Sequence, residues 1–266
     1  MSEQRGWRKT ARCGHERDMA DGRKPLDWPL NRGIPMQTAI DAVPFRFPIE
    51  GPLDPKRTAL LAIDMQVDFC GEGGMVHRWG VDLSAMRAPI APLRRVMEAC
   101  RATGIRIVHT RETYAPDLSD FPAARRARQS AATPGKATGD RGPHGAHLVR
   151  GEPGWDFIPE LKPLPGETVI DKPGFGAFHK TRLEEILREA GIAQLVLTGV
   201  TTNCCVASTL REAEDRGFEC LVLADCCADP RPTGHNEAIA FMRRNGIFGT
   251  VAESDALIRA LASLPR

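Results

Sequence analysis

The chain has 266 residues, of which 42% are hydrophobic and 26% charged, and its formal net charge is +2. This length and composition are typical of a folded globular protein with a sizeable core, and they exclude a wholly disordered chain. The small net charge gives no support for a polyanionic partner, so we predict that the protein binds no nucleic acid.

No apolar run approaches the roughly 20 residues that a membrane-spanning helix needs. The N-terminus also lacks the apolar core of a secretion signal, so we expect a cytoplasmic protein without a membrane partner. The eight cysteines should then be reduced, and they show neither a Cys-x-x-Cys pair nor a histidine spacing typical of zinc. A disulfide framework is not expected.

Two regions differ in their pattern. Residues 1–50 are rich in Arg, Pro and Gly and show weak periodicity, so we interpret them as an arm that is partly disordered or forms an interface. Residues 51–266 form the predicted domain. Met36 is a second in-frame methionine, and a start there would omit the first 35 residues.

From residue 57 onward, continuous apolar runs alternate with segments of helical spacing, as in a buried parallel sheet with crossover helices. The helix at 181–190 is expected to begin with a capping box formed by Thr181 and Glu184. This alternation predicts a three-layer α/β/α sandwich with a mainly parallel sheet of about six strands. Strands are predicted at 58–64, 105–110, 168–172, 195–198, 219–224 and 247–251, and helices at 88–103, 181–190, 205–216, 233–244 and 255–264.

An irregular excursion at 114–165 interrupts the alternation and is rich in Pro, Gly, Arg and Ala. Loops of this length inside a domain usually serve as lids or interface elements, and we predict one of these roles. We interpret the arginines between Arg125 and Arg150 as a solvated or subunit-facing surface rather than an anion-binding patch.

Three predicted strands end at a reactive side chain: Asp64, Lys172 and Cys205. Parallel strands bring their carboxyl ends to one edge of a sheet, where ligands bind. Cys205 stands where a strand gives way to a helix, a position that favours the thiolate. We predict Cys205 as nucleophile, Asp64 as base and Lys172 as cation, with backbone N–H groups of the 201–205 turn as an oxyanion hole.

Each residue also has a purely structural interpretation. Asp64 can cap a turn, Lys172 can be a solvated loop lysine, and Cys205 can be a small core residue, with Cys204 competing for the nucleophile's role. The catalytic interpretation is favoured because all three occupy equivalent positions on different strands.

Three ordered motifs resemble the isochorismatase-like cysteine hydrolases, which have a Rossmann-like fold: Ile63-Asp-Met-Gln-Val-Asp-Phe69, Ile170-Asp-Lys-Pro-Gly174 and Gly199-Val-Thr-Thr-Asn-Cys-Cys-Val206. The resemblance implies that Cys205 is the nucleophile and Cys204 a packing residue. It also implies a non-proline cis peptide before Thr201, whose N–H would contribute to the oxyanion hole with that of Cys205. A homo-oligomer, expected to be a tetramer, is implied as well.

Within that family the motifs are most similar to hydrolases of linear ureides such as biuret. This similarity implies that Phe69 lines the substrate pocket and that Asn245 reads the far end of the substrate, where a shorter amide would leave room for triuret. The stretch Thr110-Arg-Glu-Thr-Tyr114 lacks the histidines of metal-dependent relatives, so no metal and no other cofactor is predicted.

Two alternatives remain open. The first is an amidohydrolase of another carbamoyl or amide substrate, such as N-carbamoylsarcosine, ureidoacrylate or nicotinamide, with Arg111 or an arginine of the excursion binding a substrate carboxylate. The second is a ligand-binding or thiol redox protein that uses the vicinal Cys204 and Cys205, for which Asp64 and Lys172 would not be needed.

Overall fold

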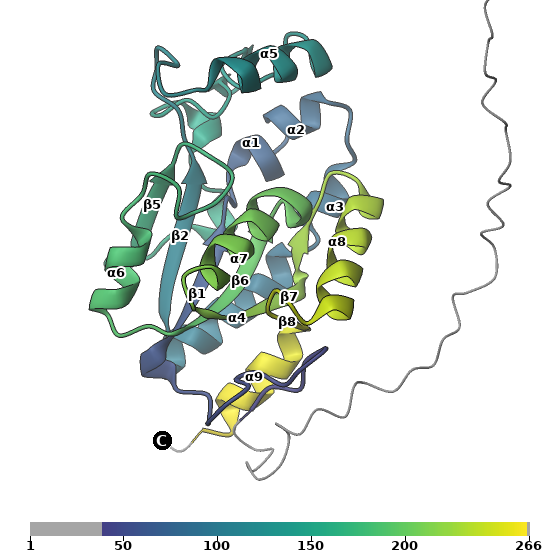
Figure 1. Cartoon of the computed structure of the whole chain (residues 1–266). Coiled ribbons are helices and arrows are strands. Elements are labelled where there is room, and N and C mark those ends of the chain that lie inside the picture. The colour runs from purple at the N-terminus through teal and green to yellow at the C-terminus, as the bar shows by residue number, and fades with distance from the viewer. Residues whose placement is uncertain (1–38, 265–266) are drawn as a thin grey trace, which may run out of the picture.

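The computed structural model describes residues 39–264, and its centre is a six-stranded sheet in which all neighbouring strands run parallel (Figure 1). The spatial order is β5-β2-β1-β6-β7-β8, so the first strand of the sheet in the chain is central. The strands are β1 (Thr58–Ile63), β2 (Arg106–Glu112), β5 (Thr168–Lys172), β6 (Gln194–Val200), β7 (Glu219–Ala228) and β8 (Thr250–Ala252). The predicted fold class is therefore confirmed.

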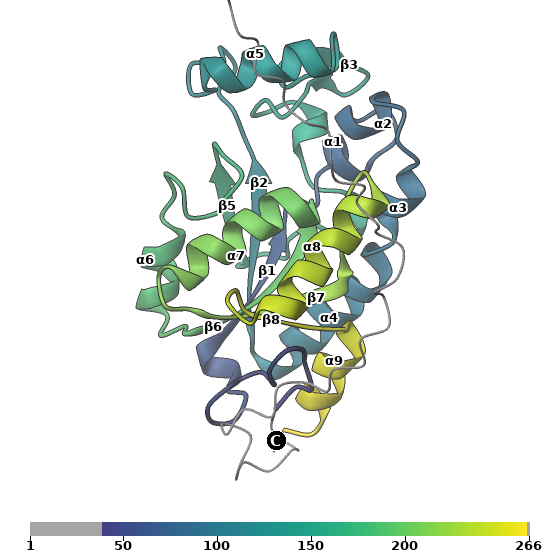
Figure 2. The ribbon, with the colours of Figure 1, turned by 45° about the vertical axis from the view of Figure 1, so that its right-hand side comes forward.

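Helices cover both faces of the sheet, and Figure 2 shows α7 and α8 in front of it. One layer contains α4 and α9, which pack on each other, and the other contains α6, α7 and α8. The helices are α1 (Val67–Cys70), α2 (Met75–Arg78), α3 (Leu83–Arg87), α4 (Ile90–Thr103), α5 (Ala123–Ala132), α6 (Leu183–Glu189), α7 (Ala207–Glu214), α8 (Pro232–Asn245) and α9 (Ser254–Ala262).

The two layers follow from the alternation of side chains along each strand. In β1, Leu60 packs in the cluster that contains Leu257 of α9, whereas the next residue, Leu61, packs in the cluster that contains Leu210 of α7. All six residues of β1 are buried, which explains its uninterrupted apolar sequence. Each fully buried leucine stabilises the fold by about 1.5–3 kcal/mol.

The helix boundaries agree with the predictions except at a few ends. Gly104 ends α4 in the left-handed conformation at φ 79°, as expected for a glycine stop. The capping box predicted for α6 is not formed, because the helix begins one residue later, after Arg182, and Glu184 instead accepts a hydrogen bond from Arg216 at 3.0 Å. The predicted strand at 247–251 is shorter and shifted, as β8 covers only Thr250–Ala252.

The 114–165 excursion is more ordered than its composition suggests. It contains α5 and a small hairpin of β3 (Arg141–Gly142) and β4 (Gly145–Ala146), and α5 lies beyond the carboxyl ends of the strands (Figures 1 and 2). None of the residues of α5 is buried. The helix therefore depends on a few contacts for its position.

A chain of hydrogen bonds through Arg78, His147 and Asp68 joins the excursion to the body of the domain. Nη1 of Arg78 lies 2.7 Å from Nε2 of His147. Because arginine only donates, Nε2 must accept, and the proton sits on Nδ1, which donates to Asp68 at 2.6 Å. The other carboxylate oxygen of Asp68 accepts from the N–H of Leu148 at 2.7 Å, so the excursion is held at the two residues that follow its hairpin.

Of the predicted N-terminal arm, residues 1–38 lie outside the described part of the chain. Residues 39–50 pack on the domain: Ile40 forms a bridge with Phe47, both are buried, and Val43 pairs antiparallel with Val251 of β8. No helix among residues 39–264 is long and apolar enough to cross a membrane.

Candidate active site

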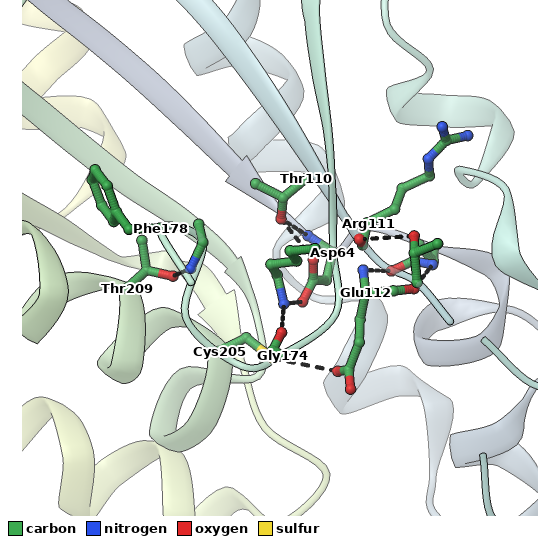
Figure 3. A network of polar contacts seen from close by, with 12 residues as sticks. Asp64, Thr110, Arg111, Glu112, Gly174, Phe178, Cys205 and Thr209 are labelled. Carbon is green, nitrogen blue, oxygen red and sulfur yellow. Dashed lines mark hydrogen bonds and ion pairs between the residues drawn. The ribbon is translucent and has the colours of Figure 1, made fainter. Parts of the chain in front are cut away.

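The carboxyl ends of four neighbouring strands place four reactive side chains together. Asp64 follows β1, Glu112 ends β2, Lys172 ends β5, and Cys205 lies in the turn after β6. The strand register aligns Glu112 with Lys172 directly. Figure 3 shows the resulting cluster, in which Cys205 lies below Asp64 and a dashed line joins it to Glu112. The three residues predicted from sequence are thus brought together, and Glu112 is an addition to them.

Asp64 and Lys172 form a fully buried ion pair, with 2.6 Å between Nζ and Oδ2. The hydroxyl of Thr110 donates to Oδ1 of Asp64 at 2.6 Å, and Nζ of Lys172 also donates to the carbonyl of Gly174 at 2.8 Å. Burial alone would lower the pKa of Lys172, but the negative groups around it, Asp64 first, raise that pKa above its usual range. Lys172 is therefore a charged ammonium in the cluster and not a solvated loop lysine.

The loop that follows Lys172 is pinned to α7. The N–H of Ala177 donates to the hydroxyl of Thr209 at 3.1 Å, and the N–H of Phe178 donates to Glu212 at 2.9 Å. A side chain at Gly176 would collide with the Glu212 carboxylate, since its Cβ would lie 2.2 Å from that group. These contacts fix the Gly174 carbonyl that holds the ammonium.

Cys205 lies within a π-helical turn, Thr202–Val206, that leads into α7. Carboxylate oxygens of Asp64 and Glu112 and the Cys205 sulfur all lie within 4.8 Å of one another. The pKa of the Cys205 thiol is raised by a hydrogen bond with Cys204 and by burial, and Lys172 only partly offsets this rise. These effects favour the thiol and oppose the preference for the thiolate at the start of a helix, so the group needs a base such as the predicted Asp64.

Glu112 is the functional candidate that sequence reasoning missed. Its Oε2 lies 3.8 Å from the Cys205 sulfur, and its Oε1 accepts a hydrogen bond from the Tyr114 hydroxyl at 2.6 Å. Burial raises the pKa of Glu112, while Lys172 and the Tyr114 hydrogen bond oppose the rise. The predicted strand stopped at residue 110, so its last acid was not placed at the sheet edge.

Arg125 of α5 contacts both Tyr114 and Glu112. Its Nη1 donates to the Tyr114 hydroxyl at 2.7 Å and lies 3.9 Å from Oε1 of Glu112. Its guanidinium also stacks on the ring of Phe175 at 4.0 Å. The Arg125 side chain is 18% exposed, so one arginine of the excursion belongs to the site rather than to a solvated surface. Arg111, the other cation considered, is instead bound to Asp171 at 2.8 Å and stacked on Trp155.

The turn predicted as an oxyanion hole has the expected backbone. The peptide bond between Val200 and Thr201 is cis and is not followed by proline. The turn is further held by a hydrogen bond of 2.9 Å between the hydroxyl of Thr202 and Nδ1 of His235 at the start of α8. The N–H groups of Thr201 and Cys205 remain the predicted donors.

Both predicted substrate contacts stay predictions. Phe69 is buried on α1 in the cluster that also contains Tyr114. Asn245 is the last residue of α8, and its side chain lies outside the described part of the structure.

Asp64, Glu112 and Cys205 are also the kind of group that can bind a metal. The ammonium of Lys172 already lies against Asp64 and supplies the positive charge of the cluster. A divalent ion beside it would meet strong repulsion at this depth. The residues fit an ammonium-based site better than a metal site, and the absence of a cofactor stays a prediction.

The site is closed, since Asp64 and Lys172 are 0% and Cys205 2% exposed. A cavity of about 380 Å³ opens at the opposite, amino-terminal edge of the sheet between β2 and β5, where Arg101 and Glu167 lie. That cavity is far from the reactive cluster.

The model of the Isochorismatase domain matches residues 58–256, which span all six strands of the sheet. This chain belongs to the isochorismatase family. The resemblance seen in the three sequence motifs is confirmed at this level, and the family region includes Asp64, Lys172 and Cys205.

Similar proteins include two curated enzymes. Ureidoacrylate amidohydrolase RutB of Pantoea ananatis is 35% identical over 201 residues, covering 74% of this chain and 79% of the relative. The same enzyme of Serratia proteamaculans is 31% identical over 220 residues, covering 79% and 84%. The crystal structure of N-carbamoylsarcosine amidase from Thermoplasma acidophilum is 27% identical, with a TM-score of 0.57 over 75% of this chain and 97% of that chain.

Proposed function

We propose that the protein is a cysteine amidohydrolase that releases ammonia from the terminal carbamoyl group of a ureido acid. The observation that carries the proposal is the buried Asp64–Lys172 pair, 2.6 Å apart, beside the protonated Cys205 thiol. A base, a cation and a nucleophile in contact suit acyl transfer and have no evident packing role. A redox role for Cys204 and Cys205 would leave the ion pair unexplained.

In the first half-reaction, Asp64 accepts the thiol proton while the Cys205 sulfur attacks the carbonyl carbon of the carbamoyl group. Lys172 stabilises the negative charge on sulfur, and the N–H groups of Thr201 and Cys205 bind the oxyanion. Asp64 then returns the proton to the leaving nitrogen, and the C–N bond breaks to release ammonia. A thiocarbamate ester of Cys205 is left behind.

In the second half-reaction, a water molecule loses its proton to Asp64 and attacks the same carbon. The C–S bond breaks, the proton passes from Asp64 to the sulfur, and the product leaves as an N-substituted carbamate. Each step uses Asp64 once as acid and once as base, which balances the protons over the cycle.

The substrate class is proposed from two supports. The relatives named above act on ureidoacrylate and N-carbamoylsarcosine, which both combine a carbamoyl group with a carboxylate. In this chain, the guanidinium of Arg125 lies 3.9 Å from Oε1 of Glu112, whose Oε2 lies 3.8 Å from the sulfur, and there it can bind the acid end of such a substrate. Among the described residues, its only hydrogen bond goes to Tyr114, which leaves donors for a ligand.

The ureides biuret and triuret are the second candidate, favoured by the motif resemblance. They carry the same carbamoyl group but no carboxylate. Ammonia release from ureidoacrylate, N-carbamoylsarcosine, biuret, triuret and nicotinamide tests the proposal, with Cys205→Ala as the inactive control. Arg125→Ala should raise KM for ureidoacrylate at least tenfold and change KM for biuret much less. Turnover of nicotinamide alone, or of none of the five, would refute the proposed function.

A further inference from the structure

Within residues 39–264, one oxygen of Glu112 has no strong hydrogen-bond donor, although the side chain is almost completely buried at 3% exposure. Its Oε1 accepts a hydrogen bond from Tyr114, whereas its Oε2 meets, in this part of the chain, only the thiol of Cys205, a weak donor at 3.8 Å. Buried carboxylate oxygens normally accept strong hydrogen bonds, because an unpaired one costs free energy. Oε2 can therefore accept a hydrogen bond from a donor that the described residues do not supply.

Structural roles do not account for this oxygen. The ion pair with Arg125 involves the other oxygen, Oε1, at 3.9 Å. The backbone of Glu112 is held separately: its N–H donates to Oε1 of Gln66 at 2.8 Å, and Nε2 of Gln66 donates back to the Glu112 carbonyl at 3.1 Å. Gln66 also donates to the carbonyl of Trp155 at 2.8 Å. The carboxylate is thus fixed in place with Oε2 directed at the nucleophile.

Attack by the Cys205 sulfur leaves Oε2 of Glu112 without any donor from the cluster. Once Cys205 gives its proton to Asp64, Oε2 loses even its weak S–H partner. The carbon under attack then bonds to the sulfur, so the nitrogens on that carbon come into hydrogen-bonding range of an acceptor 3.8 Å from the sulfur. Asp64 serves the nitrogen that leaves. The nitrogen that stays remains for Glu112.

We propose that Oε2 of Glu112 accepts a hydrogen bond from the retained N–H of the substrate and thereby selects ureido compounds over plain carboxamides. The inference rests on the proposed function and adds a specificity residue to it. A ureido group, –NH–CO–NH2, offers the N–H, whereas a carboxamide, –CH2–CO–NH2, presents a methylene to a buried carboxylate. N-carbamoylsarcosine has a methyl group in place of that hydrogen, so it should be a poor substrate like the carboxamides. Sites built to bind a substrate N–H strongly reject analogues that lack it.

Matched substrates test this directly. Ureidoacrylate is compared with the monoamide of cis-glutaconate, and N-carbamoylglycine with succinamate; each pair differs only by N–H against CH2. We expect the wild type to prefer the ureido member of the pair about 100-fold or more in kcat/KM. In Glu112→Ala that preference should fall below about fivefold, because the ureido substrate loses much more activity than the carboxamide.

Glu112→Gln keeps the volume of the side chain and one neutral acceptor, so its preference should lie between those of the wild type and Glu112→Ala. A merely structural role would reduce both members of a pair equally and leave the ratio unchanged in the variants. That result would overturn the inference, as would a wild type that hydrolyses both members equally well. A wild type without activity on any carbamoyl compound would instead refute the proposed function.

Discussion

Replacing Lys172 with Met removes the cation of the cluster and leaves the Asp64 carboxylate buried without its partner. Both side chains are 0% exposed, so water cannot take over the role of the ammonium. Two unit charges 2.6 Å apart attract each other by about 6 kcal/mol at an effective dielectric constant of 20. Desolvation of the two charges offsets much of this attraction in the intact pair.

Removing one partner of a buried ion pair destabilises the fold by more than the intact pair stabilises it, because the remaining charge stays in the interior without a partner. We expect Lys172→Met to lower the free energy of unfolding by about 3–5 kcal/mol. Asp64→Asn should have a cost of the same order, since it leaves the ammonium unpaired. In the double variant both charges are gone, and we expect a loss at least about 2 kcal/mol smaller than the sum of the single losses.

Urea unfolding at pH 7, followed by tryptophan fluorescence, measures these differences, and equal m-values would show that the unfolding transition is comparable between variants. Lys162→Met is the matched control. Lys162 pairs with Asp156 at 3.0 Å, but the two side chains are 55% and 43% exposed, so the loss should stay below about 1 kcal/mol. A Lys172→Met variant as stable as this control, or additive losses in the double variant, would refute the reasoning.

Three further predictions concern groups around the site and the sheet. Cys205→Ala should lower ammonia release at least about 10³-fold. Cys204→Ala should keep activity. Because the hydrogen bond with Cys204 raises the pKa of Cys205, this variant should also shift the pH profile of inactivation by iodoacetamide to lower pH. Tyr114→Phe removes a hydrogen bond that opposes the rise of the Glu112 pKa, so the acid limb of kcat/KM should move to higher pH. The pKa of Glu167 is lowered to about 2, because hydrogen bonds, first among them that from Arg101, outweigh the effect of burial. The contribution of Glu167 to stability is therefore present above about pH 4.5 and is lost as the pH falls towards 2. Glu167→Gln should therefore cost about 1–2 kcal/mol in urea unfolding at pH 7, with the difference narrowing below pH 4.5.

The sheet could be predicted because its strands are buried on both faces. The run at 58–64 is apolar throughout since β1 contacts helices on both sides, and this signal is strong without any periodicity. The short helices α1, α2 and α3 could not be predicted, as four or five residues give no helical repeat. The α5 helix was missed for a different reason: it buries no residue, so it has no apolar stripe to reveal it.

The chemistry of the site followed from one rule, and the same rule applied further would have found Glu112. Asp64 and Lys172 were singled out because each ends a predicted strand. Glu112 also ends a strand, in register with Lys172, but two polar residues, Arg111 and Glu112, continue β2 beyond the point where its apolar pattern fades. A strand whose last residues line a buried polar site will always look too short when hydrophobicity alone marks its end.

Arg125 illustrates a limit of a different kind. In sequence it is one of several arginines in an Ala- and Arg-rich segment, and its neighbours Arg126 and Arg128 have the same local pattern. Only the path of the excursion brings it to Tyr114 and Phe175, at the end of a helix with no buried side chain. Its place in the site therefore depends on the tertiary structure and not on the local sequence. The contacts that hold α5 therefore coincide with the place where we propose that a substrate carboxylate binds, so substrate binding and the position of α5 are energetically linked.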